Sequence, residues 1–350
     1  MQTGKYIEKI TILIFTHYRQ AYLRRVLDYY QDFNLNIAIA DSTNNPFFYD
    51  KQSKNIKYFH YPNYPFNTKM AEIFCHVTTP YVLLCADDDF YVPSAIQSCI
   101  NFLEANQDFS SVQGQSIYFT GTNSKGFDVT LFYVSDKSHE ANALTAEERL
   151  MQTMKNYVHQ YHSVHRTEIA KCCFQKLHSL YSNRNLGEIG ITLVPAINGK
   201  HRILPIFYQA RERLETAGSL QVPGILEIIA NSEMRKEYEI FLEAVTNYFC
   251  QQTGYKQSDG RICIEQAMEL YLKKIRKYEL DDQEFKKPTT YRRFKSLTKA
   301  CVPIVFLQYL QNLQLKRQTK KLPGFPFNDA DAKKEWEIIK SFVLKHNVHM

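Results

Sequence analysis

Hydrophobic positions in the first hundred residues alternate between two periods. Short apolar runs with polar flanks predict strands buried on both faces, and they occupy residues 10–15, 36–40, 56–60 and 81–86. Apolar residues at helical spacing predict helices over residues 21–33, 68–77 and 93–105. Strands that alternate with helices in this way predict an α/β fold with a mostly parallel sheet and right-handed crossovers.

The second half of the chain first continues this mixture and then becomes helical. The elements predicted before residue 231 are strands at 112–119, 129–133 and 202–209 and helices that begin at Thr145 and Gly187, the second closed by Gly199. The helices predicted after that point lie at 232–252, 259–278, 291–318 and 329–345. We therefore divide the chain into an α/β domain, residues 1–230, and an α-helical C-terminal region, residues 231–350.

Composition places the chain among ordinary folded proteins. Of 350 residues, 44% are hydrophobic and 23% charged, with only 12 Gly and 12 Pro, which excludes collagen-like and largely disordered chains. The net charge of +7 favours anionic partners such as phosphates or membrane surfaces without requiring nucleic acid. The eight cysteines include no Cys-x-x-Cys pair and suit a reduced core. With no signal sequence and no apolar run of about 18 residues, a cytoplasmic location is expected.

Polar residues follow the predicted strands, at the edge where open α/β sheets bind ligands. The four strand ends read Thr16-His17-Tyr18-Arg19, Asp41-Ser42, His60-Tyr61-Pro62-Asn63 and Asp87-Asp88-Asp89. Three successive carboxylates would repel by about 4 kcal/mol per close pair at an effective dielectric constant of 20, so a cation is expected there. Oxygen ligands indicate Mg²⁺ or Mn²⁺. The alternative is that the three aspartates cap the helix that starts near Pro93.

Three segments of the sequence resemble the GT-A glycosyltransferases, in particular family 2-like bacterial enzymes that build surface polysaccharides. The segments are ITILIFTHYRQAYLRRVLDYY, IAIADST and TPYVLLCADDDFYVPSAI with its Asp-x-Asp. The resemblance covers roughly residues 9–105 and continues more loosely to about Glu212. It implies a GT-A fold, Rossmann-like, with residues 1–230 as the nucleotide-sugar-binding catalytic domain and the helical region as an appendage outside the resemblance.

The resemblance also implies roles for the strand-end residues. The residues expected to contact the nucleotide of the donor are Thr16, Tyr18, Arg19 and Asp41. Asp89 would be a direct ligand of Mn²⁺ or Mg²⁺ between the two donor phosphates, and Asp87 or Asp88 would face the ribose or metal-bound water. Asp87 thus serves as both a donor-binding and a metal-binding candidate. Lys69 would add a phosphate contact, with a solvated helix face as its alternative.

An inverting transferase also needs a base for the acceptor hydroxyl. The resemblance points to Glu188, although the commoner Glu-Asp pair is here Glu188-Ile189. Its alternative is stabilisation of the first turn of its own helix.

Two further groups of polar residues lie before and after Glu188 in the sequence. His159, His162 and His165 suit a strand beside the acceptor pocket better than a zinc site, which would need a fourth ligand. Arg211 and Glu212 either approach the diphosphate or acceptor, or form a surface ion pair.

The basic stretch from residue 286 to residue 321 surrounds the apolar segment FKSLTKACVPIVFLQYLQNL. Basic flanks around an apolar helix suit peripheral contact with the inner face of a membrane that carries a lipid-linked acceptor. The alternative is that this stripe docks on the catalytic domain or on a second subunit.

The sequence therefore predicts a metal-dependent, inverting glycosyltransferase that moves a sugar from a UDP-linked donor to a glycan or lipid-linked acceptor. One alternative is a nucleotidyltransferase acting on sugar phosphates, but the glycine-rich phosphate loop that such enzymes carry at the first strand is missing between Phe15 and Tyr22. Another is a non-catalytic glycan-binding module, in which the acidic cluster would be incidental.

Overall fold

The computed structural model describes most of the chain. The described residues are 7–51, 54–122, 126–133, 139–157, 159–177, 180–214, 222–286, 304–320, 322–346 and 348. No helix within these ranges is long and apolar enough to cross a membrane.

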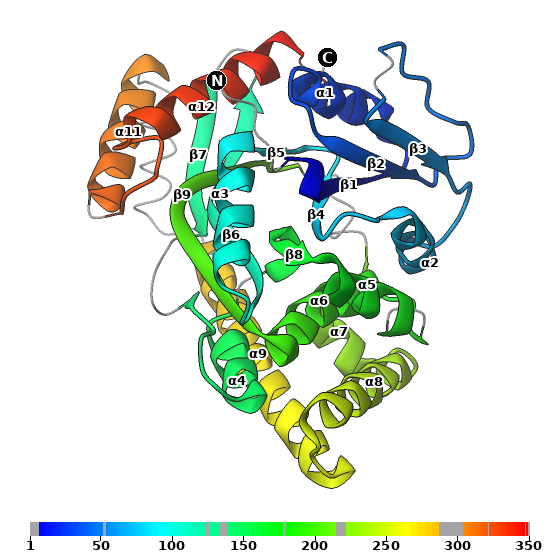
Figure 1. Ribbon diagram of the computed structural model, residues 1–350. Helices are drawn as coiled ribbons and strands as arrows, with labels where there is room; N and C mark the ends of the chain where they lie inside the picture. Colours follow the sequence, from blue (N-terminus) through cyan, green and yellow to red (C-terminus); the bar gives the residue numbers. More distant parts are fainter. Residues whose placement is uncertain are drawn as a thin grey trace.

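A curled nine-stranded sheet forms the centre of the described structure (Figure 1). The strands are β1 Ile10–Thr16, β2 Asn36–Asp41, β3 Ile56–His60, β4 Tyr81–Ala86, β5 Asp89–Tyr91, β6 Phe109–Thr122, β7 Gly126–Tyr133, β8 Val164–Arg166 and β9 Lys200–Glu212. Their order is β3-β2-β1-β4-β8-β6-β9-β5, with β7 paired to β6. The pairs among β3, β2, β1 and β4 are parallel, as the sequence predicts.

The other half of the sheet is mixed. β6 and β9 are parallel, whereas β8 is antiparallel to both β4 and β6, β5 is antiparallel to β9, and β7 is antiparallel to β6. The sequence pattern does not predict β5, and β8 covers only the end of the strand expected around His159, His162 and His165. β5 and β8 connect the parallel half to the β6–β9 pair and so bring β9 next to the acidic residues that follow β4.

Helices cover both faces of the sheet. Those described are α1 Gln20–Tyr30, α2 Phe66–Ile73, α3 Pro93–Ala105, α4 Ala146–Lys155, α5 Thr167–Cys172, α6 Arg184–Asn198, α7 Ile225–Ala230, α8 Arg235–Thr253, α9 Gln257–Lys286, α11 Ile304–Thr319 and α12 Ala330–Lys345. Successive residues of β1 point to opposite faces. Ile12 and Ile14 lie in a core with α1, α3 and α12, whereas Leu13 and Phe15 lie in a second core with α2, α6 and α8.

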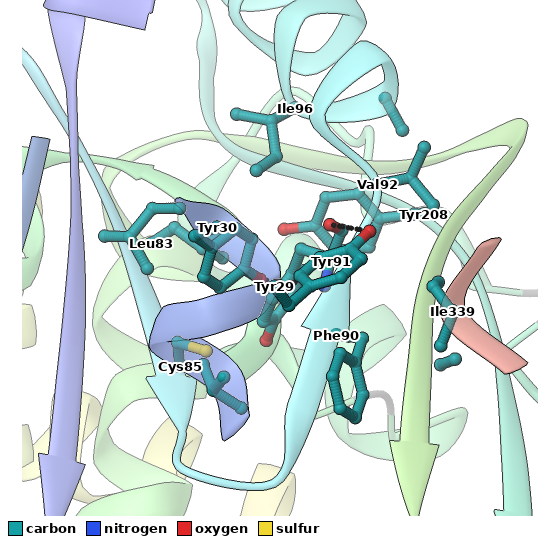
Figure 2. Close-up of a cluster of buried hydrophobic side chains, with 14 of the residues drawn as sticks. Tyr29, Tyr30, Leu83, Cys85, Phe90, Tyr91, Val92, Ile96, Tyr208 and Ile339 are labelled. Atoms are coloured by element: carbon teal, nitrogen blue, oxygen red, sulfur yellow. Dashed lines mark hydrogen bonds between the residues drawn. The ribbon is translucent and has the colours of Figure 1, made fainter. Parts of the chain in front are cut away.

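The helices after residue 230 divide between these two cores. The helices α8 and α9 pack with α4 and α6 in the second core. In contrast, α12 crosses the other face, where Ile339 joins aromatic side chains from α1, β5 and β9 (Figure 2). Tyr91 and Tyr208 meet there edge to face, with ring centroids 5.1 Å apart. The C-terminal helices thus complete the cores of the α/β part.

Several local expectations can be compared with the structure. The helix expected from Thr145 is α4, and Thr145 forms a capping box with Glu148. Gly199 follows α6 as expected, but in extended conformation; a Cβ there would lie 2.9 Å from the Asp108 carbonyl oxygen, so close packing explains the glycine. The strand expected around the histidines is wrong for Gln160–His162, which is a 3-10 helix.

Part of the basic C-terminal stretch lies outside the described residues, namely 287–303 and 321. This part includes much of the helix expected at 291–318. The remainder forms α11, and Leu315 of α11 is buried in the core that contains α12. That contact agrees with docking of the stretch on the α/β part.

Candidate active site

The ends of β1, β2 and β4 lie side by side. The parallel register pairs Thr16 with Asp41, the last residues of β1 and β2. Because the register of β1 and β4 ends with Phe15 and Ala86, Asp87 emerges next to Thr16. The Thr16 hydroxyl donates a 2.7 Å hydrogen bond to Asp87 Oδ2. These strand ends therefore gather the predicted residues at one edge of the sheet.

Arg19 lies across the first two carboxylates of the acidic cluster. One terminal nitrogen of its guanidinium is 3.3 Å from Asp87 Oδ1, and the other donates a 2.6 Å hydrogen bond to Asp88 Oδ2. Asp87 and Asp88 are 3% and 7% exposed. The described residues provide no hydrogen-bond partner for Asp88 Oδ1.

Asp89 is held by different residues, all from the other half of the sheet. Its place in β5 lies opposite Arg211 in β9, whose Nε is 3.3 Å from Asp89 Oδ1. The amide of Gln209 donates to Asp89 Oδ2 at 3.1 Å, and His162 Nδ1 lies 3.6 Å from the same oxygen. Asp89 is only 1% exposed. Both of its oxygens therefore already have protein partners.

Burial dominates the electrostatics of the acidic cluster. It raises the pKa of Asp87, and the adjacent Asp88 carboxylate raises it further against the effect of Arg19. Burial likewise raises the pKa of Asp89, while Arg211 opposes the shift. These carboxylates are costly to keep ionised without cations.

Lys69 of α2 lies close to the acidic cluster, at the ends of β1 and β2. It is 2% exposed, and its ammonium group donates hydrogen bonds to the Thr16 carbonyl oxygen at 2.8 Å and to Ser42 Oγ at 3.0 Å. Burial lowers its pKa to about 8, against the attraction of Asp41 and Asp87. The alternative of a solvated helix face is therefore wrong. Two of the three ammonium donors hold the β1 and β2 ends together.

Asp41 and Tyr18 have contrasting surroundings. The Asp41 carboxylate is fully buried and accepts hydrogen bonds from the Thr43 amide at 2.8 Å and the Tyr58 hydroxyl at 2.9 Å. Tyr18 is 58% exposed, with a positive φ of 53° that few non-glycine residues adopt. The structure thus turns Tyr18 toward solvent at the strand edge and uses Asp41 to shape the loop after β2.

Glu188 lies on α6, which begins at Arg184 because the Asn183 side chain caps it. Glu188 is therefore in the second turn, and the alternative of first-turn stabilisation is wrong. Its carboxylate is 3.3 Å from Arg184 Nε and 3.8 Å from His159 Nδ1.

Tyr118 of β6 lies next to Arg211, the partner of Asp89. Burial raises the pKa of Tyr118, Arg211 lowers it, and the carboxylates of Asp89 and Glu188 both raise it. The Tyr118 hydroxyl is 3.4 Å from a terminal nitrogen of Arg211.

Neither helix capping nor a surface ion pair accounts for the charged residues around Asp89. The residue that caps α3 is Val92, without any side-chain hydrogen bond, so capping does not explain the three aspartates. Arg211 and Glu212 do not form a surface ion pair with each other: Arg211 contacts Asp89, and Glu212 forms a fully buried ion pair with Arg25 of α1.

The donor atoms of the acidic cluster limit the metal ion that it could hold. No group of three or more His, Cys, Asp or Glu side chains in the described ranges could hold a metal ion, the three histidines included. Mg²⁺ that completes its shell with phosphates and water needs only one or two carboxylates. Asp88 has one unengaged oxygen and fits that requirement, whereas both oxygens of Asp87 and of Asp89 already have protein partners.

Sequence reasoning missed several contacts of the site. The sequence pattern does not predict that Asp89 contacts Gln209 and His162. It also does not predict that Glu188 contacts Arg184. No sequence signal could have found Gln209 and Arg211, because their contacts with Asp89 depend on the pairing of β9 with the three-residue strand Asp89–Tyr91.

Two cavities, of about 660 and 630 Å³, lie beside the loop after β2 and share Phe47 and Phe48. The acidic cluster lines neither of them.

Comparison with known proteins gives structural likenesses only. No family model matches the sequence, and no curated protein matches it. Solved structures similar to the chain include S. aureus TarS 1–349, with 10% identity and a TM-score of 0.46 over 76% of this chain and 72% of that one. The complex of TarS 1–349 with UDP-GlcNAc gives 10% identity and a TM-score of 0.48 over 76% and 73%. The complex with UDP gives 12% identity and a TM-score of 0.40 over 77% and 91%.

Proposed function

We propose that this protein is a glycosyltransferase that transfers the sugar of a UDP-linked donor to a glycan or lipid-linked acceptor of a bacterial surface polysaccharide. The observation that carries the proposal is the cluster at the ends of β1, β2 and β4. There, Arg19 and Lys69 lie among buried carboxylates at the edge where open α/β sheets bind ligands. The resemblance of the sequence to GT-A glycosyltransferases supports the same function.

The cationic groups suit the diphosphate of a nucleotide sugar. Arg19 presents a planar fork, a shape that matches phosphate oxygens, and its side chain is 20% exposed. The Lys69 ammonium group holds the ends of β1 and β2 together and places a positive charge next to them. Both would stabilise the negative charge that develops on the departing nucleoside diphosphate.

A Mn²⁺ or Mg²⁺ ion is part of the proposal. Asp87 and Asp88 would hold it together with the donor phosphates. When bound, the ion supplies positive charge against the charge that develops on the leaving group. Asp89, the ligand that the sequence favours, would first have to release Arg211.

Glu188 is the proposed general base, which makes the reaction inverting. The Glu188 carboxylate lies 3.3 Å from Arg184 Nε and 3.8 Å from His159 Nδ1, and these two side chains help to fix its position. A carboxylate in that position can accept the proton of the acceptor hydroxyl as the hydroxyl attacks the sugar. The proton then resides on Glu188 until it is released to water.

Titration calorimetry of the full chain with UDP, with and without Mn²⁺, tests the proposal together with donor hydrolysis across a panel of nucleotide sugars. We expect saturable UDP binding that Mn²⁺ strengthens, and weaker UDP binding after Arg19→Gln. Arg24→Gln is the matched control, because Arg24 lies in α1, five residues after Arg19, but pairs with the exposed Asp50. Absence of both UDP binding and donor hydrolysis in the unaltered protein would overturn the function.

A further inference from the structure

Two arginines neutralise the acidic cluster, and their surroundings differ. The side chains of Arg19 and Arg211 are each 20% exposed, and each has a nitrogen 3.3 Å from a buried carboxylate. Arg211 belongs to β9, and its partner Asp89 also accepts a hydrogen bond from Gln209. The Arg211–Asp89 pair is therefore built into the sheet and has no spare oxygen.

Arg19 is held less completely. It stands before the first turn of α1, outside the strands, and makes no cap hydrogen bond there with its side chain. Its Nε is buried and has no hydrogen-bond partner within the described ranges. Asp88 Oδ1, on the carboxylate that Arg19 holds, has none there either. Arg19 thus keeps one buried nitrogen without a hydrogen bond, which is unfavourable.

We infer that Arg19 is a displaceable internal counter-ion, which occupies the cation position beside Asp87 and Asp88 until a divalent cation and the donor diphosphate replace it. The inference rests on the proposed function and deepens it. Arg19 and a divalent cation cannot both lie against the same oxygens, since their positive charges repel. Arg19 released from Asp88 retains a guanidinium fork that suits a phosphate group.

This arrangement makes the binding of cation and nucleotide cooperative. Without nucleotide, a cation must compete with Arg19 for the carboxylates, so its affinity is low. With nucleotide present, Arg19 gains a new anionic partner, and the competition weakens. Coupling of this kind is reciprocal, so the cation strengthens nucleotide binding by the same factor.

The test is Mn²⁺ binding to the nucleotide-free protein, measured from free Mn²⁺ by electron paramagnetic resonance. Arg19→Gln should bind Mn²⁺ at least about tenfold more tightly than the unaltered protein, because a positive charge close to the carboxylates is removed. Arg24→Gln is the matched control and should change the affinity by less than about threefold, because Arg24 pairs with the exposed Asp50 and not with the acidic cluster. Unchanged Mn²⁺ affinity in Arg19→Gln, or equal tightening in both variants, would overturn the inference.

Arg19→Lys keeps the test decisive if the glutamine variant does not fold. Lysine retains the charge but cannot bridge both carboxylates, so Mn²⁺ should bind about threefold more tightly, and unchanged affinity counts against the inference. Circular dichroism and the thermal midpoint establish folding for every variant. Failure of the proposed function appears separately, as absent UDP binding in the unaltered protein, because the Mn²⁺ comparison uses no nucleotide.

Discussion

At the scale of single residues, the sharpest prediction concerns Glu188. Glu188→Gln preserves shape but cannot accept a proton, so transfer should fall by about 10²–10⁴-fold while Mn²⁺-dependent UDP binding stays near normal. Steady-state transfer rates and calorimetry on the same preparation measure both quantities.

The chain offers a close control for this substitution. Glu265 also pairs with an arginine four residues earlier, Arg261, but on the exposed surface of α9. Glu265→Gln should leave transfer unchanged and alter the free energy of unfolding by no more than about 0.5 kcal/mol. A stable Glu188→Gln variant with normal turnover would remove Glu188 from the role of base.

The residues of the site that sequence could predict are those next to strand ends. Thr16, Arg19 and Asp87 follow directly from the parallel register, because adjacent strands end at the same edge. The partners of Asp89 could not be found in this way. Arg211 lies 122 positions away in the sequence, and its contact depends on the antiparallel pairing of β5 with β9.

At the scale of elements, buried histidines on the two strands that flank β6 predict a dependence of stability on pH. Burial lowers the pKa of His165 in β8 to about 4 and that of His201 in β9 to about 3. In the unfolded chain these groups take up protons near pH 6.5. Between those values the unfolded chain binds more protons, so the free energy of unfolding falls as the pH falls.

Urea denaturation at several pH values between 7 and about 5 checks this prediction, and His201→Gln isolates one contribution. The raised pKa values of Asp87 and Asp89 make the folded chain bind more protons, which acts in the opposite direction. The pH dependence of the free energy of unfolding of the unaltered protein is therefore a sum of both effects and does not isolate the histidines. The informative quantity is the difference in slope, which should be shallower in the variant by the order of 1 kcal/mol per pH unit. Equal slopes would show that His201 is not buried in neutral form.

Whether the sequence pattern reveals an element at all depends on the length of that element. The strand at 56–60 and the helix at 93–105 have the predicted bounds. Their five and thirteen residues are enough for the spacing of hydrophobic positions to be recognised. β5 and β8 span three residues each, which is too few to show a repeat of hydrophobic positions. These strands are defined by their pairing with β9, β4 and β6.

At the scale of the whole molecule, α12 should be essential for the stability of the α/β part. Trp336 is buried, and its ring lies 5.5 Å from that of Phe119 in β6. Trp336→Ala should lower the free energy of unfolding by about 3–5 kcal/mol. Leu344→Ala in the same helix is the control, since Leu344 is 56% exposed, and it should cost less than about 0.5 kcal/mol. Urea denaturation of both variants measures this, and equal losses would contradict a core role for α12.

The role of α12 also determines how membrane contact should be tested. Truncation before the basic stretch would remove α12 and damage the core, so loss of vesicle binding would be ambiguous. Neutralising charges in the intact chain avoids this problem. One variant carries glutamine at Arg292, Arg293, Lys295 and Lys299; the control carries glutamine at Lys333, Lys334, Lys340 and Lys345 of α12.

Sedimentation with anionic vesicles then separates two sources of binding. Each basic residue near an anionic surface contributes about 1 kcal/mol, so losing four should weaken binding by about 10²–10³-fold if residues 286–321 form the contact. The control has the same net charge but should bind almost as well as the unaltered chain. Equal weakening of both variants would attribute vesicle binding to the overall charge of +7 and would leave the basic stretch without a membrane role.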